Sequence, residues 1–308
     1  MNFNFLEKLS GDASLRQFYR DKKNKTIIVY CKKDKYKNLL VYDAINKLLR
    51  KNKINSPSML KQSYTNNYIE IEDLGKNHNI KNFKKFDLKK YEDIFKILDK
   101  FKKIKNRKIN TFLNTKYTIP IYSEDLLYSE CKLFTKWYMP TIVKKNKNSI
   151  AKNFNKILKS LIKKLKLKKK IFVHRDFHLS NIILFKNKIF LIDTQDAVFG
   201  NQAYDLASII DDVRNKVSLN NREKLYNKFI KGKKNLNKAM FRNDFEILSA
   251  LRNLKIIGIF TRLSIRDKKH SYKKMIPYAW QMIFERCQSN KELKELINFI
   301  KLHFTKYI

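Results

Sequence analysis

The stretch that decides the fold is VHRDFHLSNIILFKNKIFLIDTQD, residues 173–196. It contains the sequence His-Arg-Asp, which ends at Asp176, and an asparagine five residues later, Asn181. A carboxylate at Asp176 would accept the proton of an attacking hydroxyl group. Asn181 and Asp193 would supply hard oxygen ligands to a Mg²⁺ ion that bridges the phosphates of a nucleotide. These are the chemical groups that a phosphoryl-transfer site needs.

Two apolar runs, 182–185 and 189–192, follow this loop. The polar residues between them predict the turn of a hairpin whose second strand leads into Asp193. The spacing H-R-D-x-x-x-x-N, with a metal-binding aspartate after the following strand, is the catalytic-loop signature of the protein-kinase-like fold. Taken singly, His174 could be a packed core histidine and Asp193 a turn cap. The agreement of three groups with the predicted hairpin favours the phosphotransferase interpretation.

The composition is that of a globular protein. The chain has 308 residues, of which 43% are hydrophobic and 13% aromatic, enough for two lobes with a sizeable core. Lysine and arginine number 69 against 28 aspartate and glutamate residues, a formal net charge of +41. Because the lysines are spread over predicted helices and loops alike, we interpret this charge as coding bias. We expect no specific nucleic-acid partner.

Cysteine usage and hydropathy indicate the compartment. Cys31, Cys131 and Cys287 lie far apart without metal-ligand spacing, which indicates a reducing compartment and no disulfide framework. The first ten residues have no basic segment followed by an apolar core, and no apolar run reaches the length of a membrane span. We therefore expect a cytoplasmic protein without a membrane segment and without an obligate protein partner.

The N-terminal part predicts strands joined by tight turns. The runs 15–20 and 26–31 are of β type, and a turn of small residues precedes the first. In a kinase-like N-lobe this turn covers the nucleotide phosphates with backbone N–H groups, although an ordinary turn would have the same composition. The turn residues expected to bind nucleotide are Gly11, Asp12, Ala13 and Ser14.

The segment 39–49 has the apolar spacing of a helix with one buried face, in the place of the single N-lobe helix. After it, 68–72 alternates apolar and polar residues like a strand. Glu72, Asp73 and Leu74 would then form the hinge, where backbone groups hydrogen-bond a purine. We expect a nucleotide-covering lobe at residues 1–73 and a mainly helical lobe with the catalytic and acceptor sites at 74–308.

Apolar spacing predicts several helices in the second lobe. Their ranges are 87–104, 128–138, 153–167, 206–213, 245–263 and 278–287. Glu130, in the second of them, is a candidate acceptor ligand, although an ion-paired surface glutamate is the more frequent case. Arg252 and Arg262, in an otherwise apolar helix, could face an anionic ligand or a core carboxylate. Asp205 would sit at a helix start, where a carboxylate satisfies free N–H groups.

With these residues in view, the chain resembles the aminoglycoside phosphotransferase and choline kinase superfamily. Within it, the chain is most similar to the N-acetylmuramate/N-acetylglucosamine 1-kinases of cell-wall recycling. The segments that carry the resemblance are GDASLRQFYR (11–20), IEIEDLG (69–75), YSECKLFTKWY (128–138), VHRDFHLSNIIL (173–184), LIDTQDAVFGNQAYDLASIIDDVR (191–214) and ALRNLKIIGIFTRLSIRD (250–267). The resemblance implies a two-lobed α+β fold of the protein-kinase type, with a small β-rich N-lobe and a mainly helical C-lobe.

The resemblance also implies ATP and Mg²⁺ as cofactors, with Asp176 as the base and Asn181 and Asp193 as metal ligands. The residues expected to support the catalytic loop are His174, His178, Asp196 and Asp205. The chain departs from the pattern in having no Val-Ala-Ile-Lys to mark the nucleotide lysine. Lys32 follows the second predicted strand in imperfect register, and Arg16 or Arg20 could contact the phosphates instead.

Three functions remain open from the sequence. The first is transfer of phosphate from ATP to the anomeric hydroxyl of an N-acetylated amino sugar. If that sugar is N-acetylmuramate, its lactyl carboxylate could pair with Arg252 or Arg262. The second keeps the enzyme but changes the acceptor to an aminoglycoside, choline or another amino alcohol. The third is a pseudokinase or basic binding protein, which the presence of Asp176, Asn181 and Asp193 disfavours.

Overall fold

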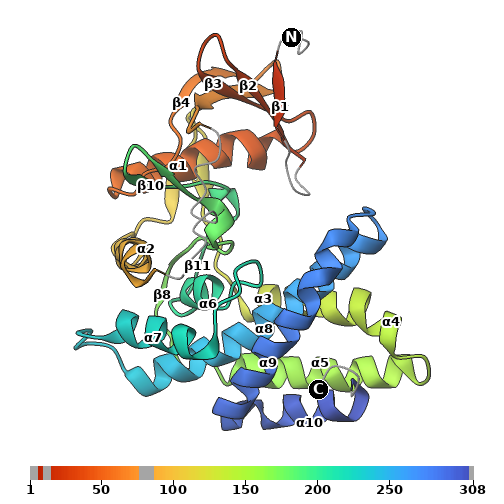
Figure 1. Ribbon diagram of the computed structural model, residues 1–308. Coiled ribbons are helices and arrows are strands. Elements are labelled where there is room, and N and C mark those ends of the chain that lie inside the picture. The colour runs from red at the N-terminus through yellow and green to blue at the C-terminus, as the bar shows by residue number, and fades with distance from the viewer. Residues whose placement is uncertain (1–5, 10–14, 76–86, 305–308) are drawn as a thin grey trace. The chain divides into compact units, whose positions relative to one another are not determined.

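The computed structural model describes residues 6–9, 15–75 and 87–304 (Figure 1). The chain divides into two compact units, the first made of residues 1–120 and 171–199, the second of 121–170 and 200–308. The predicted hairpin thus belongs to the same unit as the N-terminal strands. The expected division at residue 73 into a nucleotide-covering lobe and a lobe with the catalytic and acceptor sites stays a prediction.

The first unit contains a five-stranded antiparallel sheet in the order β1-β2-β3-β5-β4. Its strands are β1 (Glu7–Leu9), β2 (Gln17–Asp21), β3 (Thr26–Tyr30), β4 (Met59–Ser63) and β5 (Tyr68–Glu72). Alternate apolar residues of β3 and β5, among them Val29 and Ile69, are fully buried in one cluster. The predicted strands near 15–20, 26–31 and 68–72 are confirmed, while the predicted turn at Gly11 to Ser14 lies outside the described residues.

A helix packs against this sheet. It begins as a π-helical turn, η1 (Tyr36–Val41), and continues as α1 (Tyr42–Lys51). Leu39 and Tyr42 join the sheet's buried cluster, so the helix predicted at 39–49 is confirmed. The π-helical start was not predicted. Figure 1 shows α1 running alongside the sheet.

The rest of the N-terminal segment of this unit consists of α2 (Leu88–Phe101) and a short hairpin. Asp87 caps α2, because its side chain accepts hydrogen bonds from the N–H groups of Lys89 and Lys90. The hairpin pairs β6 (Lys108–Asn110) with β7 (Lys116–Thr118) and was not predicted, since each strand has three residues.

The second segment of the first unit carries the predicted catalytic hairpin. Strand β8 (Lys170–Val173) leads into the loop, and β9 (Ile182–Phe185) pairs with β10 (Lys188–Leu191). The turn residues Lys186 and Asn187 both have positive φ, 47° and 57°, the geometry that matches the twist of a two-residue hairpin. Strand β11 (Val198–Asn201) then pairs with β8.

Asn55, between α1 and β4, fixes this hairpin within the unit. Its side-chain nitrogen donates to the carbonyl of Ile189 at 3.0 Å, and its carbonyl accepts from the N–H of Leu191 at 2.9 Å. One asparagine therefore bonds to β10 through both its side chain and its backbone. The strand that leads to Asp193 is held to the N-terminal part of the unit.

The second unit is helical in its described residues. Its longer helices are α3 (Glu124–Leu133), α5 (Lys147–Lys163), α6 (Tyr204–Ile210), α7 (Leu219–Ile230), α8 (Lys238–Ile265), α9 (Ile276–Ser289) and α10 (Lys294–His303). Short helical segments are η3 (Phe134–Tyr138), α4 (Met139–Ile142), η6 (His270–Met275) and η7 (Lys291–Leu293). Helix α8 packs against α3, α6 and α9 and is buried nearly all round, as the apolar run 245–263 predicts.

Gly258 allows α8 to approach its neighbour. A Cβ atom at this position would lie 2.3 Å from the carbonyl carbon of Leu133, at the end of α3. No larger side chain fits without separating the two backbones, so glycine is required here for packing.

A buried ion-pair cluster joins α6, α7, α8 and α9. The carboxylate of Asp211 meets Arg222 Nη1 at 2.8 Å and Arg286 Nε at 2.9 Å, and it accepts a hydrogen bond from Ser249. Burial raises the pKa of Asp211, but the charge and hydrogen bonds of Arg286 and the charge of Arg222 outweigh burial and hold that pKa well below its usual range. The cluster was not predicted, because its members come from three separate helices and from Asp211, the residue that follows α6.

Two further expectations concern the whole chain. Within the described ranges, no helix is long and apolar enough to cross a membrane. The thiols of Cys31, Cys131 and Cys287 are free and buried, as the absence of a disulfide framework predicts.

Candidate active site

The loop between β8 and β9 is held by its own polar groups. Asn181 Nδ2 donates to the carbonyl oxygen of Asp176 at 2.9 Å, and the backbone N–H of Asn181 donates to the carbonyl of His178 at 2.9 Å. Because the amide nitrogen is used within the loop, the side-chain oxygen is the atom of Asn181 that could meet a cation. His178, 8% exposed, lies with Nε2 3.5 Å from Asn181 Nδ2, within the loop that it was expected to support.

The residue before Asp193 ties β10 to this loop. The N–H of Ile192 donates to the carbonyl of Asn181 at 3.1 Å, and the carbonyl of Ile192 lies 3.0 Å from His174 Nε2. Burial lowers the pKa of His174, against the opposing charges of Asp176 and Asp193, which favours a neutral ring that donates a hydrogen bond to this carbonyl. Asn181 and Asp193 are therefore brought together by backbone hydrogen bonds, although they are far from neighbours in sequence.

Asp193 has an unusual backbone conformation. Its φ of 61° and ψ of 42° are left-handed, which few residues other than glycine adopt. It begins the short helix η5 (Thr194–Asp196), and 40% of its side chain is exposed. Arg175, beside Asp176, also has a positive φ, 75°. Such conformations persist where the surroundings determine them, and they gather at functional sites.

Two donors hold the carboxylate of Asp193. Arg16 Nη2 and Gln195 Nε2, the latter at 3.1 Å, both donate to Oδ1. The oxygen of the Gln195 side chain in turn accepts from Arg16 Nη1 at 2.6 Å. These contacts orient the carboxylate and leave Oδ2 as the oxygen that could meet a metal ion. Sequence reasoning named Arg16 only as an alternative phosphate contact and did not name Gln195.

The helix η5 is anchored to the N-terminal helix of the same unit. Thr194 Oγ1 donates to Asn46 Oδ1 at 2.7 Å, and Lys37 Nζ lies 2.5 Å from Asp196 Oδ1. Burial raises the pKa of Asp196, but the hydrogen bond and charge of Lys37 outweigh it, so the pKa lies below its usual value. The carbonyl of Asp196 also accepts from Arg175 Nη1 at 3.2 Å, which links η5 to the loop that Asp196 was expected to support.

The predicted nucleotide-binding residues differ in their surroundings. Gly11, Asp12, Ala13 and Ser14 lie outside the described residues. Lys32 is exposed and follows β3 rather than lying in it. The role of these residues stays a prediction.

The expected hinge is fixed by an arginine. Arg20 binds the carboxylate of Asp73 with two nitrogens, at 2.6 and 3.0 Å, and this hydrogen bonding raises the pKa of Arg20. Glu72 ends β5, and Leu74 is buried at 5% exposure. The Asp73 side chain thus has a structural partner, while the proposed use of backbone groups to bind a purine stays a prediction.

The candidate acceptor residues belong to the second unit. Glu130 is buried, with Lys255 Nζ 2.8 Å from its carboxylate and the Tyr122 hydroxyl donating to it. The charge of Glu130 is therefore compensated by an ion pair, but this pair is buried, whereas the alternative interpretation of the sequence expected one at the surface. Lys255 was missed, although a lysine within the apolar run of α8 is the kind of signal that marks a buried pair.

The two arginines of α8 and Asp205 have separate surroundings. Arg252, 4% exposed, lies with Nη1 3.4 Å from the carbonyl oxygen of Asp211. The Nε of Arg262 is buried and has no hydrogen-bond partner among the described residues, and burial lowers the pKa of this arginine. Asp205 is 3% exposed in the first turn of α6, where Ala203 is the cap residue. Its support of the catalytic loop stays a prediction.

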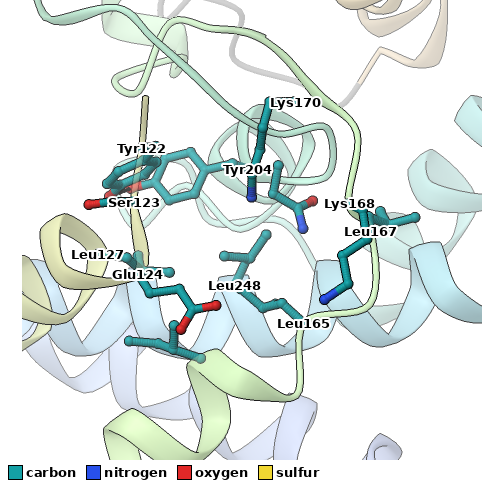
Figure 2. A pocket seen from close by; sticks show the side chains of 12 residues that line it. Tyr122, Ser123, Glu124, Leu127, Leu165, Leu167, Lys168, Lys170, Tyr204 and Leu248 are labelled. Carbon is teal, nitrogen blue, oxygen red and sulfur yellow. Dashed lines mark hydrogen bonds between the residues drawn. The ribbon is translucent and has the colours of Figure 1, made fainter. Parts of the chain in front are cut away.

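A surface cavity of about 230 Å³ lies wholly within the second unit (Figure 2). Leu127, Leu165 and Leu248 form part of its apolar wall, and Figure 2 shows the side chains of Lys168 and Lys170 beside it. None of the predicted site residues that the structure describes lines it.

The donor set suits magnesium. Mg²⁺ in phosphoryl-transfer sites is held by one or two protein oxygens and completes its shell with phosphates and water. Asn181 and Asp193 offer such oxygens. In the part of the chain that the structure describes, no group of three or more His, Cys, Asp or Glu residues could hold a metal ion by itself.

Residues 133–232, which include the loop, the hairpin and α6, match the model of the phosphotransferase enzyme family. A protein named N-acetylmuramate/N-acetylglucosamine kinase from Caulobacter vibrioides is 31% identical over 143 residues, 45% of this chain and 38% of that protein. The match therefore spans less than half of that relative. The protein of the same name from Pseudomonas aeruginosa is 24% identical over 300 residues, 93% of this chain and 85% of that protein.

Solved structures share the fold. A choline/ethanolamine kinase family protein from Mesorhizobium loti has a TM-score of 0.61 at 11% identity, over 96% of this chain and 92% of that one. The GDP and kanamycin complex of the phosphotransferase APH(2″)-IIia has a TM-score of 0.62 at 10% identity, over 94% and 95%. The predicted α+β fold of the protein-kinase type is confirmed. The family match over residues 133–232, the distant relatives and the shared fold agree in making this chain similar to phosphotransferase enzymes.

Proposed function

We propose that this chain is an ATP- and Mg²⁺-dependent phosphotransferase that phosphorylates the anomeric hydroxyl of an N-acetylated amino sugar, N-acetylmuramate or N-acetylglucosamine. The product would be the sugar 1-phosphate, and the setting cell-wall recycling in the cytoplasm. The match of residues 133–232 to the phosphotransferase family model supports phosphoryl transfer. The names of the Caulobacter and Pseudomonas relatives support the choice of acceptor.

The observation that carries the proposal is the set of hydrogen bonds that joins Asn181 to the residue before Asp193. It joins the backbone of Asn181 to that of Ile192, the residue before Asp193, which supports a metal site shared by Asn181 and Asp193 beside the loop that bears Asp176. Asp176 would accept the proton of the sugar hydroxyl as its oxygen attacks the γ-phosphorus, and ADP would leave. Bound Mg²⁺ would neutralise charge on the phosphates. The left-handed backbone of Asp193 and its contacts with Arg16 and Gln195 keep its carboxylate oriented before the nucleotide binds.

The nature of the acceptor follows from charge. A site for a polycation such as an aminoglycoside needs several carboxylates without partners. In the segments 128–138 and 248–266, which would line the acceptor, Glu130 is paired with Lys255. The basic side chains Arg252 and Arg262 in α8 suit a neutral or anionic acceptor better, including a sugar with a carboxylate.

The acceptor hydroxyl can be tested with a blocked sugar. We expect purified protein with Mg-ATP to phosphorylate free N-acetylmuramate or N-acetylglucosamine and to leave the 1-O-methyl glycoside unchanged, because the glycoside lacks only the anomeric hydroxyl. Release of ADP and ³¹P spectra of the product would measure both reactions. The 6-deoxy sugar is the matched control, and it should be turned over like the parent.

Equal turnover of the free sugar and its methyl glycoside would exclude an anomeric kinase. Efficient turnover of kanamycin or choline, with none of the amino sugars, would instead assign the chain to an amino-alcohol acceptor. Binding of ATP without turnover of any of these acceptors would favour a pseudokinase.

A further inference from the structure

Arg16 is a buried cation next to the predicted metal site. It precedes β2 and is only 5% exposed. Its guanidinium lies 5.5 Å from the ring centre of Phe18 and 5.4 Å from that of Tyr42. These aromatic faces favour a cation in this place and restrict the side chain to one position.

Polar contacts direct the same guanidinium to Asp193. One terminal nitrogen donates to Asp193 Oδ1 and the other to Gln195 Oε1, while Gln195 also donates to Asp193. The three side chains thus form a closed triangle of hydrogen bonds. Burying a charged group costs free energy unless the charge is paired and hydrogen-bonded. A buried arginine beside a predicted metal-binding carboxylate is therefore a candidate for a functional role.

The other basic candidates are less suited to binding phosphates. Lys32 is exposed on the segment after β3. Arg20 donates to both oxygens of Asp73 and, at 2.8 Å, to the carbonyl of Gly75. Its donors are thus directed at the segment after β5, and it has no contact with Asp193 among the described residues.

We infer that Arg16 is the cation that binds the phosphates of the nucleotide, in place of the strand lysine that this sequence lacks. The inference rests on the proposed function. Asp193 would hold the Mg²⁺ ion that accompanies the nucleotide phosphates. The Arg16 guanidinium donates to the same carboxylate, so phosphates held there would lie beside it. The planar fork of arginine can then bond to a phosphate and to Gln195 together.

The test uses calorimetry without acceptor and compares binding of ATP and adenosine in the presence of EDTA with binding of Mg-ATP. We expect Arg16→Gln to weaken ATP binding about tenfold or more, as loss of a charge-assisted contact requires, and to leave adenosine binding unchanged. Arg16→Met, whose flexible apolar side chain fills similar space between Phe18 and Tyr42, should do the same. Arg16→Lys should recover part of the ATP affinity. Lys61→Gln, at an exposed lysine of β4, is the control for loss of one charge and should match the wild type.

Each outcome decides between the roles. If Arg16 only holds Asp193 in place, its removal weakens Mg-ATP but not metal-free ATP, and the inference is overturned. Equal loss of ATP and adenosine affinity in the Gln and Met variants also overturns it, since phosphates are then not what Arg16 recognises. If either of these two variants unfolds, as circular dichroism would reveal, the other and Arg16→Lys decide. A wild type that binds no ATP at all would reject the proposed function itself.

Discussion

Asp176→Asn should lower kcat by roughly 10²-fold or more, the loss expected for a general base, while nucleotide affinity stays nearly unchanged. The reason is that Asp176 would act on the acceptor's proton and not on the nucleotide. Its carbonyl, which accepts from Asn181, stays in place in the variant because the backbone is the same. Initial rates of ADP release and calorimetric binding of Mg-ATP would measure the two effects separately.

Asp193→Ala should lower kcat as well, but it should also weaken Mg-ATP binding, because it removes the carboxylate that would hold the metal. It also leaves Arg16 and Gln195 without their common acceptor. The control is Asp93→Asn, on the exposed side of α2 in the same unit, which should keep wild-type turnover. Wild-type turnover in both site variants would show that the catalytic assignment is wrong.

Asp211→Asn should destabilise the protein by about 3 to 5 kcal/mol, the cost of removing one partner from a buried ion pair. The carboxylate is fully buried, as are Arg222 and Arg286, so the variant leaves their guanidinium groups short of a counter-charge that water cannot replace. Thermal unfolding followed by circular dichroism would show a fall in Tm. Asp267→Asn, which breaks an exposed pair with Arg266 in the same unit, is the control and should cause no measurable change.

The depressed pKa of Asp211 predicts how the difference in Tm between the wild type and Asp211→Asn depends on pH. The folded-state pKa of Asp211 is depressed, so its contribution to stability is fully present above the ordinary carboxyl pKa of about 3.9. It is lost as pH falls toward the lower folded-state value. The gap in Tm between the wild type and Asp211→Asn should therefore be constant near neutral pH and shrink only below about pH 4. A gap that shrinks already near neutral pH would contradict this assignment.

The catalytic hairpin could be predicted because its signals are local. Two apolar runs separated by Lys186-Asn187-Lys188 differ from the observed strands by at most one residue at an end. Helix α8 was found for a similar reason, since residues 245–263 are apolar nearly all round. Its first turns, from Lys238, were missed because they contain charged residues that do not repeat with the helical period.

The environment of Asp193 could not be predicted in the same way. Its contact with Arg16 joins residues 177 positions apart, and no periodicity in sequence relates them. The left-handed backbone of Asp193 likewise depends on contacts made by Thr194 and Asp196 with the N-terminal helix. Helix α7 was missed because several of the side chains it buries, including Arg222 and Tyr226, are polar at one end and match no apolar stripe.

The first unit is built from two separate segments of the chain, and this limits the order in which its parts can fold during synthesis. Residues 1–120 contain the sheet and α1, but the hairpin that Asn55 holds belongs to 171–199, behind fifty residues of the other unit. A ribosome that adds about 5 to 20 residues per second delivers this hairpin several seconds after Asn55. Until then the nascent N-terminal segment has Arg16 without Asp193. Because loop closure over such a separation is entropically costly, the catalytic centre should be among the last parts of the first unit to become ordered.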